Sequence, residues 1–180
     1  YEIGSGLVGS EMCIRDRPMV AVVRCNGTCA NRPRVNQYDG AKSCAIAASL
    51  YGGETGCSYG CLGCGDCVAA CQFGALSIKD GIASVDPEKC VACGKCVETC
   101  PNGVISLQPY DTKYQVNCNS KDKGKDVMSV CKAGCIGCGL CVRQCEFGAV
   151  TLENNLATID PLKCQGCGKC AEKCPKKVIA

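Results

Sequence analysis

Ten cysteines of this 180-residue chain, from Cys44 to Cys100, recur at a constant interval as the ten from Cys118 to Cys174. The sequence around them repeats as well, with GCLGCGDCVAAC returning as GCIGCGLCVRQC and FGALSI as FGAVTL. The chain is therefore a duplication of one unit, and each unit is itself duplicated. A repeat that keeps its cysteines in place indicates that cysteine chemistry determines the structure.

The motif inside each unit is C-x2-C-x2-C-x3-C, and it occurs four times. Its first three thiolates can wrap a loop around one 4Fe–4S cubane, and in two-cluster ferredoxins the fourth Cys ligates the partner cluster. We expect this fourth Cys to start a short helix and to point away from the first three. The predicted ligand sets are Cys61, Cys64, Cys67 and Cys100; Cys90, Cys93, Cys96 and Cys71; Cys135, Cys138, Cys141 and Cys174; and Cys164, Cys167, Cys170 and Cys145.

Composition narrows the chemistry of these cysteines. The chain has 23 Cys and no His, which excludes mixed Cys/His zinc sites, Rieske centres, His-ligated haem and Cys-His catalysis. The odd number of Cys and the lack of a secretory signal argue against a disulfide scaffold. Structural zinc is the alternative, but zinc would use two Cys of each motif and leave the other two without a role. The spacing favours four 4Fe–4S clusters.

The segments between the motifs predict an α+β fold. Residues 75–78 and 82–85 alternate around Lys79-Asp80-Gly81, and residues 150–152 and 156–159 flank Glu153-Asn154-Asn155, so both read as hairpins. We expect strands at 19–25 and 114–118 and helices at 45–51 and 124–130. The predicted organisation is tandem two-cluster, bacterial-type ferredoxin-like domains preceded by a small Cys-containing α/β module. Its parts are non-native sequence at 1–18, the module at 19–60, a ferredoxin-like domain at 61–109, a connecting strand–helix segment at 110–134 and a second ferredoxin-like domain at 135–180.

Besides Cys13 near the N-terminus, six further cysteines lie outside the motifs. Cys25, Cys29, Cys44 and Cys57 have a spacing that is compatible with a fifth cluster. The alternative is that they are buried structural thiols, since free Cys is often buried. Cys118 and Cys131 have no such partner set and stay unassigned.

The first seventeen residues have no period of 2 or 3.6, and they resemble the translated read-through of a sequencing adapter. A genuine N-terminal segment is the alternative. We expect Cys13 to take no part in ligation and the natural protein to be longer on this side.

No constellation of residues here predicts a catalytic site, NAD or flavin binding, or a nucleic-acid surface. Lys and Arg are scattered, and aromatic residues make up only 4% of the chain. The formal charge of +3 counts every Cys as neutral; sixteen thiolates and four 2+ cores change it to roughly −5. The motifs favour an electron carrier over an enzyme that is complete in this chain.

Several segments outside the bare ferredoxin motif are more specific: VVRCNGTC, YDGAKSCAIAA, GGETGCSYGCLGCGDC, CNSKDKGK, GCIGCGLC and TLENNLATID. With them, the chain from Met19 onward resembles the B subunit of Rnf-type ion-translocating ferredoxin:NAD oxidoreductases. Members of that family usually begin with a hydrophobic anchor and a further Cys-rich cluster domain. The resemblance implies an electron-transfer subunit on the cytoplasmic face of a membrane complex. It would take electrons from reduced ferredoxin and pass them to other subunits of the complex.

Two other classes of protein stay open at this point. One is a free-standing soluble polyferredoxin, and the other is the electron-input subunit of a soluble flavin dehydrogenase. Each would use the same motifs without a membrane complex.

Overall fold

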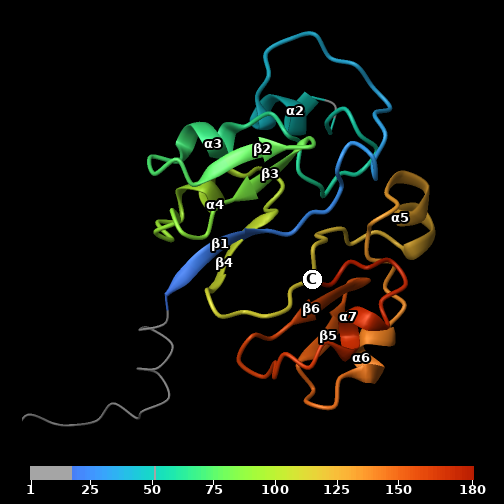
Figure 1. Ribbon diagram of the computed structural model, residues 1–180. Coiled ribbons are helices and arrows are strands. Elements are labelled where there is room, and N and C mark those ends of the chain that lie inside the picture. The colour runs from blue at the N-terminus through green and yellow to red at the C-terminus, as the bar shows by residue number, and fades with distance from the viewer. Residues whose placement is uncertain (1–17, 51) are drawn as a thin grey trace, which may run out of the picture.

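In the computed structural model, which describes residues 18–50 and 52–180, the chain folds into two halves of the same design (Figure 1). Each half has a two-stranded antiparallel ribbon and two short helices, one within each Cys motif. In the first half these are α3 (Asp66–Ala70), β2 (Leu76–Lys79), β3 (Ile82–Val85) and α4 (Lys95–Thr99). In the second they are α6 (Leu140–Gln144), β5 (Val150–Glu153), β6 (Leu156–Ile159) and α7 (Lys169–Glu172).

Both predicted hairpins are confirmed. β2 pairs with β3 from Leu76↔Val85 to Lys79↔Ile82, and β5 pairs with β6 in the equivalent register. The turns use residues with positive φ, Asp80 and Gly81 in the first half and Asn154 and Asn155 in the second. Such conformations suit a two-residue connection, because their backbone twist matches that of the strands.

A further strand pair extends the first half. β1 (Met19–Val23) runs antiparallel to β4 (Ile105–Pro109), with Ala21 opposite Leu107. The boundary predicted at residue 60 therefore does not separate β1 from this half. In the second half, the strand expected at 114–118 is reduced to a bridge between Val116 and Ile179, with hydrogen bonds between residues 115–117 and 178–180.

The two longer helices lie outside the ferredoxin-like motifs. α5 (Gly124–Val130) has the predicted bounds, and α2 (Cys44–Leu50) begins one residue earlier than predicted. Tyr51 and residues 1–17 lie outside the described residues. Residues 1–17 include Cys13 and all of the predicted non-native segment except Pro18. No helix within the described part of the chain combines the length and apolar character needed to cross a bilayer.

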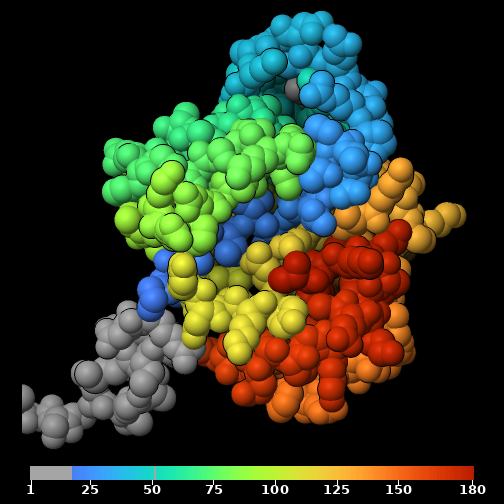
Figure 2. Space-filling model, viewed as in Figure 1, coloured from blue at the N-terminus to red at the C-terminus, as the bar shows by residue number. Residues whose placement is uncertain are grey.

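Polar contacts join the two halves. The Arg24 guanidinium donates to the Asn119 side chain at 2.7 Å, and the Asn119 amide donates to the Asn102 carbonyl at 3.0 Å. The Lys132 backbone N–H donates to the Asn31 carbonyl at 2.9 Å. In Figure 2 the segment after β1 (blue) accordingly packs against the region of α5 (orange).

The hydrophobic core of each half is small and contains thiols. Val104 and Val178, which occupy equivalent positions of the repeat, are each 1% exposed. Around each valine the core is built of aliphatic side chains mixed with the cysteines of the motifs. In each half, the apolar side chains and the cysteines of the motifs therefore lie in the same core.

Replacing either valine by alanine tests the equivalence of the halves. We expect Val104→Ala and Val178→Ala to destabilise the protein by similar amounts, about 2 kcal/mol each, because each removes two buried methyl groups and leaves a cavity. The measurement is the midpoint of anaerobic thermal unfolding at one scan rate. Val35→Ala, at a residue that is 63% exposed, serves as the control and should leave the midpoint unchanged. A large effect in one half alone would contradict the prediction.

Candidate metal centres

A glycine with a left-handed backbone starts each short helix. Gly65, Gly94, Gly139 and Gly168 follow the second Cys of the four motifs and have φ between 69° and 93°. The next turn of helix carries the third Cys, which is buried in all four motifs. The fourth Cys lies where the helix ends, not where it begins, so the predicted helix position is wrong by one turn. At Cys71, Cys100 and Cys145 the backbone is extended, which turns the fourth side chain away from its own loop.

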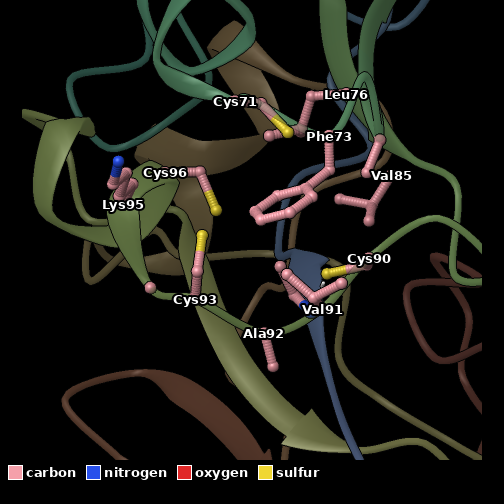
Figure 3. A pocket seen from close by; sticks show the side chains of 13 residues that line it. Cys71, Phe73, Leu76, Val85, Cys90, Val91, Ala92, Cys93, Lys95 and Cys96 are labelled. Atoms are coloured by element: carbon pink, nitrogen blue, oxygen red, sulfur yellow. Dashed lines mark hydrogen bonds between the residues drawn. The ribbon is translucent and has the colours of Figure 1, made fainter.

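One cavity in the first half is lined by Cys90, Cys93 and Cys96 together with Cys71 of the other motif. It has a volume of about 350 Å³. Figure 3 shows the sulfur atoms arranged around a common space, with the ring of Phe73 among them. The structure thus brings this predicted ligand set together.

The second half contains two equivalent cavities. Cys135, Cys138 and Cys141 share a cavity of about 380 Å³ with Cys174. The second is lined by Cys164, Cys167, Cys170 and Cys145 and has a volume of about 310 Å³. Both combine three thiols of one motif with the fourth thiol of the other, as in the predicted sets.

The remaining motif differs in one respect. Its cavity of about 320 Å³ is lined by Cys61, Cys67 and Cys100, and also by Cys44 at the start of α2. Cys64 does not line this cavity; its thiol donates to the Leu62 carbonyl at 3.7 Å, and burial together with the nearby Cys44 raises its pKa to about 11. Asp66 anchors α2 here by accepting hydrogen bonds from the Ser43 hydroxyl at 2.8 Å and the Ala45 N–H at 3.3 Å. Four thiols therefore line this cavity, and Cys64 of the predicted set is not one of them.

Burial keeps the third thiol of each motif protonated in the absence of metal. Desolvation raises the pKa of Cys67 to about 12 and that of Cys141 to about 11, and it raises the pKa of Cys96 and Cys170 as well. A positive metal centre is what makes thiolates favourable at such positions. The buried thiols are therefore suited to bind a metal centre as thiolates.

The fourth thiol of three motifs is surrounded by backbone donors. The Ala149 N–H donates to the Cys145 sulfur at 3.3 Å, and the Val178 N–H donates to Cys174 at 3.5 Å. At Cys71, burial disfavours the thiolate, but N–H groups of residues 73–76 outweigh it and lower the pKa. Hydrogen bonds to ligand sulfurs stabilise thiolates and tune cluster potentials.

The geometry fits cubanes better than single ions. Among residues 18–50 and 52–180, no three Cys, Asp or Glu side chains are grouped as ligands of one metal ion. The thiols of the four motifs, except that of Cys64, instead line shared cavities without converging on one point. A cluster whose four irons each take a different sulfur requires thiols that are set further apart than the ligands of one ion.

The structure does not bring together Cys25, Cys29, Cys44 and Cys57. Cys44 lines the cavity of Cys61, and the exposed Cys29 lies next to Gly81 in the turn between β2 and β3. Cys25 and Cys57 line a different cavity, together with Cys118 and Cys131. The sequence did not predict that these four cysteines lie together. The signal that could have found it was the equivalence of Cys57 and Cys131 in the repeat.

Comparison with known proteins agrees with this arrangement. Residues 60–104, 89–149 and 134–178 each match the family described as 4Fe-4S dicluster domain. The B subunit of the Na(+)-translocating ferredoxin:NAD(+) oxidoreductase complex of Acetobacterium woodii is 48% identical over 162 residues, which are 89% of this chain and 49% of that protein. The B subunit of the proton-translocating ferredoxin:NAD(+) oxidoreductase complex of Clostridium ljungdahlii is 47% identical over 165 residues, 90% of this chain and 58% of that protein.

A third relative is covered more fully. The B subunit of the ion-translocating oxidoreductase complex of Methanosarcina acetivorans is 44% identical over 179 residues, 99% of this chain and 67% of that protein. The chain thus spans about half to two thirds of the length of these relatives. Among solved structures, the formate dehydrogenase–heterodisulfide reductase–formylmethanofuran dehydrogenase complex of Methanospirillum hungatei matches 67% of this chain and 51% of its own, at 22% identity. The TM-score of this match, 0.27, is too low to establish a shared overall fold.

Gly63 tests how closely the first loop must approach the hairpin. Its φ is +74°, and a Cβ there would lie 2.5 Å from the carbonyl oxygen of Gly81. We expect Gly63→Ala to displace the loop between Cys61 and Cys64 and to cost the chain about four iron atoms, one cluster. Iron per chain after anaerobic reconstitution is the measurement.

Gly74→Ala is the matched control, because Gly74 has a φ of +61° but open space around its Cα. The strain of positive φ, about 1–2 kcal/mol, is then common to both variants. Equal iron content in the two variants would show that the approach to Gly81 is not required.

Proposed function

Because this chain belongs to the family of B subunits of ion-translocating ferredoxin:NAD oxidoreductase complexes, we propose that it relays single electrons from reduced ferredoxin to partner subunits. The observation that carries the proposal is the repeated pairing of three thiols from one motif with the fourth thiol of another around a cavity. A 4Fe–4S cluster in such a cavity exchanges one electron at a time. Four such clusters in one chain would form a path for electron transfer.

The proposed ligands are the sixteen cysteines of the four motifs, in the sets predicted from the sequence. At the first motif we assign Cys64, not Cys44, to the cluster. Cys64 occupies the same place in its loop as Cys93, Cys138 and Cys167. Each of these cysteines has a glycine with positive φ on one or both sides. Cys44 then lies beside the ligand Cys64 without binding iron itself.

The exposure of the thiols supports an exchange of electrons with other proteins. The second Cys of three motifs, Cys93, Cys138 and Cys167, is exposed, whereas the third Cys is buried in all four. Three of the clusters would therefore have one edge near the surface and the rest shielded. Phe73 and Phe147, at equivalent positions, line two of the cavities and limit the access of water.

The partners and the location follow from the family as proposals. The relatives are named as subunits of ion-translocating complexes. We place this chain on the cytoplasmic face of such a membrane complex, with ferredoxin as donor and other subunits as acceptors. We assign binding of NAD and flavin to the partner subunits.

Reduction by ferredoxin tests the relay. The chain is loaded anaerobically with iron and sulfide, and we expect at least about sixteen irons per chain and a brown colour. Rapid mixing with reduced two-cluster ferredoxin should bleach the visible absorbance, with dithionite giving the full extent as control. A colourless zinc protein, or clusters that dithionite reduces and ferredoxin does not, would contradict the proposal.

Two single variants test the assignment at the first motif. We expect Cys64→Ser to remove or convert one cluster, because it deletes a ligand, and Cys44→Ser to keep the wild-type iron content. Iron analysis and low-temperature EPR of the reduced protein are the measurements. The reverse result would assign the ligand role to Cys44.

A further inference from the structure

Four cysteines outside the motifs converge at the junction of the two halves. Cys25 and Cys57 belong to the first half, and Cys118 and Cys131 to the second. All four line one cavity. Like the cavities already described, it is lined by several thiols.

The two halves contribute to this cavity in the same way. The Cys61 N–H donates to the sulfur of Cys25 at 3.4 Å, and the Cys135 N–H donates to the sulfur of Cys118 at 3.3 Å. Cys61 and Cys135 are equivalent, since each is the first Cys of the first motif in its half. Cys57 and Cys131 are equivalent as well, because each precedes that motif at the same spacing. The cavity thus has an approximate twofold arrangement of thiols.

A buried cation without a counter-charge faces the same space. Arg32 is 4% exposed and lines the cavity. Its Nη2 donates to the Cys61 carbonyl, while Nε and Nη1 have no hydrogen-bond partner among the described residues. The residues that line the cavity include no Asp or Glu. An unpaired buried charge costs several kcal/mol, so the site calls for an anionic occupant.

A tetrathiolate cubane meets these requirements. Four thiolates around a 2+ core carry a net charge of about −2, which balances Arg32 in part. A zinc ion would need four thiolates at about 2.3 Å from one point. No three Cys, Asp or Glu side chains of the described residues are grouped closely enough to bind one ion, which favours a cluster over a single ion here.

We propose that Cys25, Cys57, Cys118 and Cys131 hold a fifth 4Fe–4S cluster between the two halves, with Arg32 as its buried counter-charge. The proposal rests on the relay function and deepens it. Cys61 and Cys135 are proposed ligands of the clusters on either side, and their N–H groups contact the sulfurs of Cys25 and Cys118. The fifth cluster therefore joins the electron path of the first half to that of the second.

Iron content of the full chain tests the proposal. After anaerobic reconstitution we expect about twenty irons per wild-type chain and about sixteen in the Cys57→Ser/Cys131→Ser double variant. Cys29→Ser is the control, because Cys29 is exposed and lies outside the cavity, and it should keep about twenty. About sixteen irons in the wild type, or one zinc in addition to sixteen irons, overturns the fifth cluster and leaves the relay function standing. Iron far below sixteen in the wild type removes both.

A charge variant gives a second readout that does not depend on loss of a ligand. In a redox titration followed by EPR, Arg32→Gln should lower the potential of one cluster only, since the reduced cluster carries one more negative charge. Arg34→Gln is the matched control, because Arg34 is 70% exposed and pairs with Glu54. Unchanged potentials in Arg32→Gln would overturn the role of Arg32 as the counter-charge.

Discussion

The bond between thiolate and metal is the interaction on which the rest of this structure depends. Only three large side chains of the described residues, Val104, Val127 and Val178, are almost completely buried. The interior of each half is otherwise built around groups of thiols, and burial raises the pKa of several of them. Such an interior is poorly stable when empty, because unfilled space costs free energy and the protonated thiols gain no bonds to metal. Binding of clusters and folding are therefore coupled.

The arrangement of thiols also suits the proposed transfer of electrons. The crossed contribution of the fourth Cys ties the two cavities of each half together, so neighbouring clusters share a short segment of chain. Hydrogen bonds from backbone N–H groups surround the sulfurs and set their electrostatic environment. The polar contacts of Arg24, Asn119 and Asn102 then hold one half against the other. Local loops position the ligands within each half.

Much of the local structure could be predicted from the sequence. The hairpins follow from alternating apolar residues around Asp80-Gly81 and Asn154-Asn155, and α5 follows from its composition, because these signals are contained within a few residues. The helix predicted to begin at the fourth Cys of each motif in fact ends there, one turn earlier in the sequence. The cysteine spacing does not show that Gly65 and its equivalents begin the helix. The pairing of β1 with β4 joins segments that are far apart in sequence and leaves no local signal.

By itself the sequence determined the duplication, the four motifs and the kind of metal centre they suit, since ligand type and spacing are local properties. The tertiary structure decided which of the remaining cysteines meet. In sequence Cys118 is equivalent to Cys44, yet Cys118 lies at the central cavity and Cys44 at the first motif, where Asp66 anchors α2. Cys25 takes the place opposite Cys118 because β1 pairs with β4 and delivers it there. Only the packing of distant segments distinguishes these partners.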